Sequence, residues 1–182
     1  MNKVILLLLA TVACATAKHH HHKQAAELDE DYEMMVQGSG KDAANFFNGF
    51  AKGLVGADIG DLDQCVGATN FMPSIESAVE NFKSKNPLKI ANGIFQLFTA
   101  TLSIQNVLLS CGSISKDAAS KLISMAKTFS SLSSITSKVS RNIFVHIGGI
   151  TKGIIGATSD FSSKNFYGAG YNIGRVTIKC LG

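Results

Sequence analysis

The sequence predicts an all-α protein: a helical bundle of about five or six helices, with one disulfide bond and a flexible N-terminal tail. Residues 90–109 carry no charge, and their polar residues recur every three or four positions, which is the period of an α-helix. Only two prolines occur in 182 residues, which favours helices over a turn-rich β-sandwich. Hydrophobic residues make up 46% of the chain and charged residues 16%, so a sizeable core can form.

Residues 1–17 have the features of a secretory signal peptide. Lys3 supplies the positive start, an apolar run follows at 4–10, and Ala15-Thr16-Ala17 fits the small residues of a cleavage site. The run is too short to span a membrane. Lipidation at Cys14 is the alternative, but Thr11 stands where leucine is usual. We therefore expect a secreted, extracellular protein or one of the secretory-pathway lumen.

Residues 18–40 are expected to be a flexible tail, ahead of a single helical domain over residues 41–182. An acidic cluster over 27–33 is most simply a solvated segment. The tail opens with four histidines, His19, His20, His21 and His22. Imidazoles can bind Zn²⁺ or Cu²⁺, but nothing at a fixed spacing completes a ligand shell. We predict no functional metal site and no cofactor.

The first helix of the domain is expected over residues 41–56. Phe46, Phe47 and Phe50 share one of its faces, and Gly49 and Gly53 lie four residues apart. Small residues at this spacing let two helix backbones approach closely. A connection rich in Gly and Asp follows at 57–64, and it lacks the rest of a calcium-loop pattern. Residues 73–85 then form a short amphipathic helix whose inward face is Ile75, Val79 and Phe82.

The central helix is predicted to start at Pro87, with Asn86 as its N-cap. Its polar residues form a narrow stripe: Asn92, Gln96, Thr99, Ser103, Asn106 and Ser110. The rest of its circumference is apolar, so we expect a buried post surrounded by other helices. The natural neighbours are the three helices that carry a Gly-x-x-x-Gly pattern.

Three further segments complete the predicted bundle. Residues 115–130 form a helix capped by Ser115, and the Ser-rich residues 130–140 are expected to continue it with a kink. Residues 142–158 and 163–180 form two more helices, each with a Gly-x-x-x-Gly pattern. A strand-rich alternative for 142–180 stays open, because Ile, Val and Tyr are abundant there.

Three cysteines remain after cleavage: Cys65, Cys111 and Cys180. A secreted chain can keep disulfides, and three cysteines allow one bridge in three pairings. We favour Cys65–Cys111, because each cysteine ends an apolar segment. Cys180 is then either a free thiol against the end of the bundle or an intermolecular link that would make a homo-oligomer.

No residue pattern typical of an enzyme occurs. Residues 168–174 resemble a dinucleotide fingerprint, but with one residue too many and no acidic residue about twenty positions later. His146 is the one histidine after the tail, and it lies among apolar residues without a nucleophile motif nearby. No two carboxylates share a helical face, as a general acid and base would require. We therefore expect a protein without enzymatic activity.

The charge distribution is the one suggestive functional signal. Residues 113–182 contain nine Lys or Arg and two acidic residues. Such a surface can meet an anionic lipid surface or a polyanion, although lysines also keep a hydrophobic bundle soluble. Nucleic acid is not expected, because the protein is secreted and aromatic residues do not alternate with the basic ones. The candidate contacts are Lys138, Arg141, Lys152, Lys164, Arg175 and Lys179.

Several spaced motifs occur together: Phe-x-x-Gly-x-x-x-Gly over 46–53, then Cys65 and Cys111, and the aromatic segment 165–170 followed by Ile173-Gly174. On these motifs the chain resembles small secreted proteins of ciliates whose function is unknown, although Cys180 departs from their two-cysteine pattern. The resemblance implies a disulfide-linked helical fold and no activity. The leading expectation is a secreted, non-enzymatic binding or structural protein with an unknown protein partner. The alternative is a membrane-active or lipid-binding effector.

Overall fold

The computed structural model of the protein describes residues 40–66 and 71–182. These residues belong to one compact unit. The expected signal peptide, the histidines at 19–22 and the tail up to residue 39 lie outside the described residues.

The all-α prediction is confirmed. The described residues form helices and no strand, apart from one isolated β-bridge between Gly60 and Ile114. The strand alternative for 142–180 is wrong, because that region is helical almost throughout. A helix over residues 40–55 comes first. It is followed by α2 (Asp63–Val66), α3 (Met72–Lys83), α4 (Pro87–Ser103), α5 (Gln105–Ser110), α6 (Lys116–Thr128), α7 (Leu132–Val145), α8 (Ile147–Ser162) and α9 (Phe166–Leu181).

Two of the expected helices are interrupted, so there are more helices than predicted. Ile104 has φ −102° and ψ 8°, which ends α4 and starts α5 within the uncharged run. His146 has φ −115° and ψ 19° and separates α7 from α8. The Ser-rich residues 130–140 do not continue the preceding helix, since α7 starts anew after Ser131. Non-helical backbone angles at one residue turn the chain without a Pro or Gly to mark the position.

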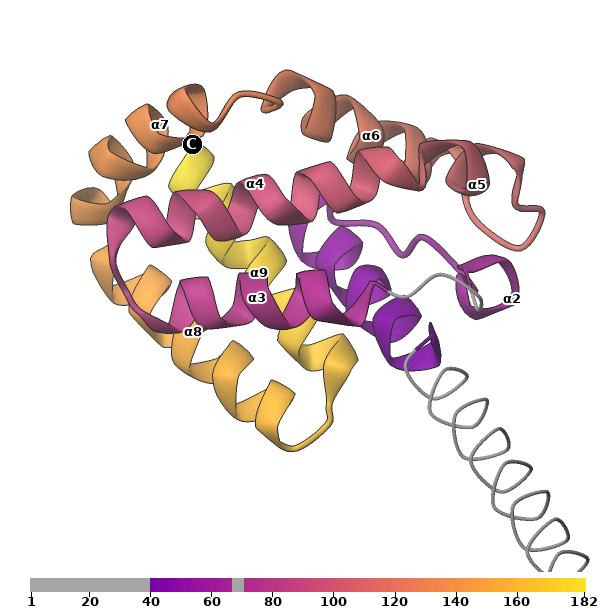
Figure 1. Cartoon of the computed structure of the whole chain (residues 1–182), viewed down its shortest axis with the longest axis horizontal. Coiled ribbons are helices and arrows are strands. Elements are labelled where there is room, and N and C mark those ends of the chain that lie inside the picture. The colour runs from indigo at the N-terminus through magenta and orange to yellow at the C-terminus, as the bar shows by residue number, and fades with distance from the viewer. Residues whose placement is uncertain (1–39, 67–70) are drawn as a thin grey trace, which may run out of the picture. The chain divides into compact units, whose positions relative to one another are not determined.

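The central helix α4 crosses the unit, with α3 alongside it and α6 and α7 on its other side (Figure 1). Helix α9 passes behind α3 and α4, and α8 packs against α9. Phenylalanines connect the helix over residues 40–55 to its surroundings. The ring centroids of Phe50 and Phe98 are 6.3 Å apart, and those of Phe47 and Phe71 are 5.9 Å apart. All four rings are buried, so they join the first helix, α3 and α4 in one core.

Two Gly-x-x-x-Gly patterns face each other rather than the central helix. A Cβ atom on Gly49 would collide with the backbone carbonyl of Tyr167 in α9. In the reverse direction, a Cβ on Gly170 would collide with the carbonyl of Phe46. The helix over residues 40–55 and α9 therefore touch backbone to backbone. Of the three helices expected to pack on the central helix, the one over residues 40–55 contacts it through Phe50 and Phe98. The expectation is wrong for α8 and α9, which pack chiefly on each other, while α4 packs on α3, α6 and α7.

The expected disulfide is present between Cys65 and Cys111, whose Cα atoms are 6.0 Å apart. The chain segments beside it are hydrogen-bonded to each other. The Ser115 amide donates to the Ile59 carbonyl at 2.7 Å, and the Ser113 hydroxyl donates to the Asp61 carbonyl at 2.7 Å. The disulfide and these bonds tie the connection before α2 to the connection before α6.

Side-chain caps start two helices where the sequence predicted them. The Asn86 side chain accepts hydrogen bonds from the amides of Leu88 at 2.9 Å and Lys89 at 3.4 Å. Ser115 accepts one from the Ala118 amide at 3.3 Å. These bonds satisfy amides that have no partner inside the helix.

Candidate functional site

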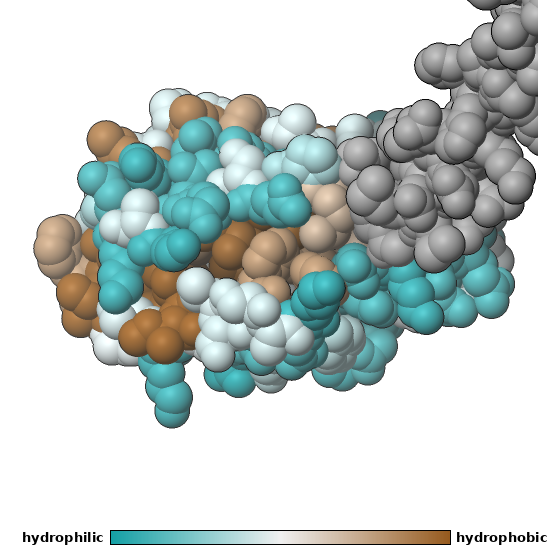
Figure 2. Space-filling model, turned by 60° about the horizontal axis from the view of Figure 1, so that its bottom comes forward, coloured by the Kyte–Doolittle hydropathy of each residue, from teal (hydrophilic) through white to brown (hydrophobic). Residues whose placement is uncertain are grey.

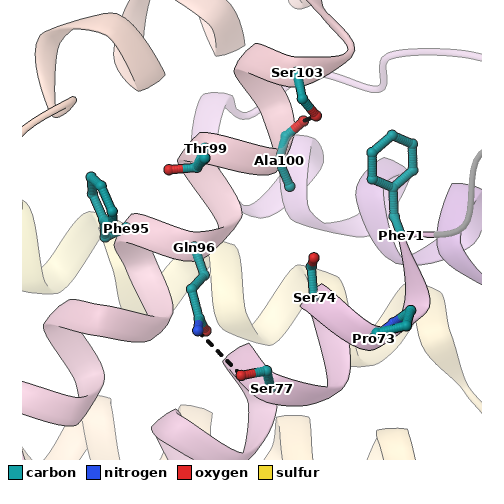
Figure 3. A pocket seen from close by; sticks show the side chains of 9 residues that line it. All are labelled: Phe71, Pro73, Ser74, Ser77, Phe95, Gln96, Thr99, Ala100 and Ser103. Atoms are coloured by element: carbon teal, nitrogen blue, oxygen red, sulfur yellow. Dashed lines mark hydrogen bonds between the residues drawn. The ribbon is translucent and has the colours of Figure 1, made fainter.

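The polar stripe of the central helix is open to solvent and borders a groove against α3. The groove has a volume of about 550 Å³, and Gln96, Thr99 and Ser103 line its α4 side (Figure 3). The Gln96 amide donates to the Ser77 hydroxyl of α3 at 3.2 Å and so links the two helices across the groove. The apolar sides of α4 are buried, as expected of a central post, but the other described helices do not cover its polar side. Polar residues are favourable on this side of α4 because none of these helices covers it.

The chemistry of the α3–α4 groove is neutral. The remaining lining side chains are Phe71, Pro73, Ser74, Ser77, Phe95 and Ala100. None of the lining residues is charged or titratable, so the groove contains no general acid or base. It can offer hydroxyl and amide groups and two aromatic rings to an uncharged molecule.

A second groove runs between α8 and α9 and is basic. It has a volume of about 350 Å³, and its charged lining residues are Lys152, Arg175 and Lys179. Gly149, Gly153 and Gly156 form its α8 side, where absent side chains make room. The structure therefore brings together three of the six basic residues predicted to contact an anionic surface.

Neighbouring groups position two of these three cations. The Arg175 guanidinium lies 5.8 Å from the centroid of the Tyr171 ring and donates to the Tyr171 hydroxyl at 3.3 Å. The Lys179 ammonium lies across Gly149, where a Cβ atom would be 2.9 Å from its nitrogen. A larger residue at position 149 would displace this ammonium, so the glycine sets where the charge lies.

The other three predicted contact residues are not part of this groove. Lys138 is held within the fold, since its ammonium donates to the Leu181 carbonyl at 3.1 Å and lies 5.6 Å from the Phe129 ring centroid. Arg141 is exposed on α7. Lys164 is exposed in the turn between α8 and α9, where its φ of 60° is left-handed.

The junction of α7 and α8 exposes three large apolar side chains. Phe144 is 76% exposed, Val145 is 73% exposed and Ile147 is 57% exposed. We call residues 144–148 the α7–α8 corner. Figure 2 shows apolar surface (brown) reaching this end of the molecule, on the left as in Figure 1, among polar side chains. The sequence predicted a helix over residues 142–158 and did not identify this exposed apolar surface.

The reason lies in the run of consecutive apolar residues. A helix buries one side, and Ile143 and Ile150 occupy the buried positions at this junction. Their neighbours therefore face solvent. The stretch of chain that contains this junction has no acidic residue, because residues 118–159 contain no Asp or Glu. His146, which the sequence placed among apolar residues, is exposed at this corner. The sequence signal that we missed is the uninterrupted run from 143 to 145.

Cys180 is fully buried in α9 and forms no disulfide within the described residues. Burial raises the pKa of its thiol to about 12. A thiol that is both inaccessible and protonated does not exchange with other disulfides. A covalent link between two copies through this residue would require the end of α9 to open.

Neither a metal-ligand cluster nor a membrane span is found in the parts of the chain that the structure describes. No three His, Cys, Asp or Glu side chains come together there as a metal site would need. No helix in residues 40–66 or 71–182 is both long and apolar enough to cross a membrane.

Comparison with known proteins identifies the family. The model of the SctB-like family, described as secreted protein B-like, matches residues 20–181. None of the curated proteins and none of the solved structures matches the chain. The match covers the whole helical unit, and it supports the resemblance to small secreted proteins. The chain belongs to the SctB-like family of secreted proteins.

Proposed function

We propose that this secreted protein acts by binding rather than by catalysis, and that it attaches to anionic lipid surfaces through the α7–α8 corner. One observation carries the proposal: Phe144, Val145 and Ile147 are exposed together in a stretch of chain that has basic residues and no acidic ones. Exposed apolar side chains gathered at one place mark interaction sites more often than scattered ones do.

The energies suit a reversible attachment. Fully burying a large apolar side chain contributes about 1.5–3 kcal/mol. Scaled by the exposed fractions of 57% to 76%, the three side chains would contribute roughly 3–6 kcal/mol on entering the acyl boundary. Each basic residue near an anionic surface adds about 1 kcal/mol. A bilayer without anionic lipid would keep the first contribution and lose the second.

The absence of catalysis is part of the same proposal. The α3–α4 groove is lined by uncharged side chains only, which suits holding a neutral molecule and not proton transfer. His146 is exposed at the corner rather than enclosed in a pocket.

Cosedimentation with vesicles tests the proposal on the secreted chain. We expect binding to phosphatidylcholine vesicles that contain phosphatidylglycerol, with an affinity that falls as salt is added. The variant Phe144→Ser should bind at least about tenfold more weakly, since it removes one inserted side chain.

Leu109→Ser is the matched control. Leu109 is 46% exposed on α5, at the other end of the unit in Figure 1, so this variant loses exposed apolar surface away from the corner. Unchanged binding of Leu109→Ser together with weakened binding of Phe144→Ser supports the proposal. Equal binding by both variants, or no binding by the unaltered protein, overturns it.

A further inference from the structure

We propose that the α8–α9 groove binds the terminal phosphate of a lipid headgroup, so that the α7–α8 corner docks preferentially on lipids that carry a phosphomonoester. The inference rests on the proposed function and names the lipid class. The inference is based on two features that share α8: a groove with three cations, Lys152, Arg175 and Lys179, and the exposed apolar side chains of the corner.

Within residues 40–66 and 71–182, the cations of the groove have no acidic partner. All the ion pairs found among the described residues involve other lysines, at positions 52, 83 and 121. Asp160 is the carboxylate that comes nearest in sequence, and it is already engaged by two amides. Its oxygens accept from the Asn172 side chain at 2.9 Å and from the Asn165 side chain at 3.0 Å. The positive charge of the groove is therefore available to an anion from outside.

The number of charges favours one class of ligand. A phosphomonoester carries about −1.5 to −2 at pH 7 and presents three acceptor oxygens. A phosphodiester has a single negative charge and fewer free oxygens. Arg175 can hold two oxygens with its planar guanidinium, while Lys152 and Lys179 act as point charges. Three cations from two helices match the monoester better than they match the diester.

The position of the groove favours a lipid over a free phosphate. Lys179 lies across Gly149, and Gly149 is two residues after Ile147 in the corner. An anion held by Lys179 would therefore lie at the same end of α8 as the side chains proposed to enter the acyl boundary. A lipid presents these two chemistries together, as a charged head directly above an apolar tail.

The experiment compares two anionic lipids at equal surface charge. Phosphatidic acid ends in a phosphomonoester, whereas phosphatidylglycerol carries a phosphodiester. Vesicles of each in phosphatidylcholine are adjusted to the same electrophoretic mobility, which removes differences in bulk attraction. We expect the unaltered protein to bind the phosphatidic acid vesicles about tenfold more tightly.

The double variant R175Q/K179Q should lose this preference. The matched control K116Q/K127Q removes the same charge from α6, where Lys116 and Lys127 are exposed. The two variants should bind phosphatidylglycerol vesicles alike, and only the control should keep the preference for phosphatidic acid. A preference retained by R175Q/K179Q would overturn the inference.

The remaining outcomes separate the two proposals. If the unaltered protein binds both vesicles equally, the inference on the groove fails and the proposed function stands. If it binds neither, the proposed function fails. Glycerol 3-phosphate in solution is the last probe, read by NMR shifts of the groove residues. An affinity as high as that for the vesicles would mean that the groove serves a soluble phosphate, which overturns the lipid assignment.

Discussion

The backbone contact between the helix over residues 40–55 and α9 can be tested with a single methyl group. Gly170→Ala places a Cβ where the Phe46 carbonyl already lies, and 2.8 Å from the Phe50 nitrogen. Both neighbours are backbone atoms, so no side chain can rotate away and the two helices must separate. Gly148→Ala is the matched control, because nothing lies within 4 Å of a Cβ at that position.

The two substitutions should change the free energy of unfolding in opposite directions. Alanine is favoured over glycine in a helix by about 0.8–1 kcal/mol. Gly148→Ala should raise the free energy of unfolding by part of this amount, since position 148 is in the first turn of α8. Gly170→Ala gains the same preference but incurs an overpacking cost of about 3 kcal/mol, the upper end of the usual range, because backbone atoms are involved. The net loss is about 2 kcal/mol, or a melting temperature lower by about 4–8 °C.

Guanidinium unfolding followed by circular dichroism at the helix band measures both variants. The midpoint should fall for Gly170→Ala and stay or rise for Gly148→Ala, with an unchanged slope in each case. If Gly170→Ala is as stable as the unaltered protein, the two backbones are not in contact and the described arrangement of these helices is refuted.

Three further predictions concern the cysteines. Replacing Cys65 and Cys111 by serine opens a loop of 46 residues, and the chain-entropy estimate gives a loss of about 4 kcal/mol, so an unchanged unfolding midpoint would contradict it. Cys180 should react with thiol reagents only as fast as the protein unfolds, because it is fully buried. Burial raises its pKa from about 9 to about 12, so only the unfolded state releases the proton in that window. The free energy of unfolding should therefore fall from pH 9 to 12, and less steeply in Cys180→Ala.

Much of the fold could be predicted from local chemistry. Asn86 and Ser115 cap helices because their side chains accept from amides within the same turn, a property that needs no knowledge of the rest of the chain. The inward face of α3 follows from its spacing in the same way. The positions of Cys65 and Cys111 at the ends of apolar segments were enough to favour their pairing over the two alternatives.

The neighbours of each helix could not be predicted so well. Glycines at a spacing of four residues indicate that some backbone comes close, but not which one, and Gly49 proved to face α9. The breaks at Ile104 and His146 carry no Pro or Gly. They depend on how the flanking segments pack, which is a tertiary effect.

For the candidate site too, the sequence predicted local features but not the ones that depend on tertiary packing. Composition and charge identified the basic half of the chain, but its six candidate residues look alike in the sequence. Only the fold separates Lys138, which bonds to the Leu181 carbonyl, from Lys152, which lines the α8–α9 groove. The exposure of Phe144 likewise depends on Ile143 having taken the buried position beside it.

The bond between Cys65 and Cys111 has a consequence for resistance to proteolysis. The loop that it closes contains α3, α4 and α5, with the exposed Lys83 and Lys85 at the turn between α3 and α4. A protease that nicks the chain at this turn leaves two fragments that still share a covalent bond. The bonds of Ser113 and Ser115 to the opposite segment hold the two cut pieces in register. A nicked molecule in an oxidising fluid can therefore keep its shape, and its fragments would separate on a gel only after reduction.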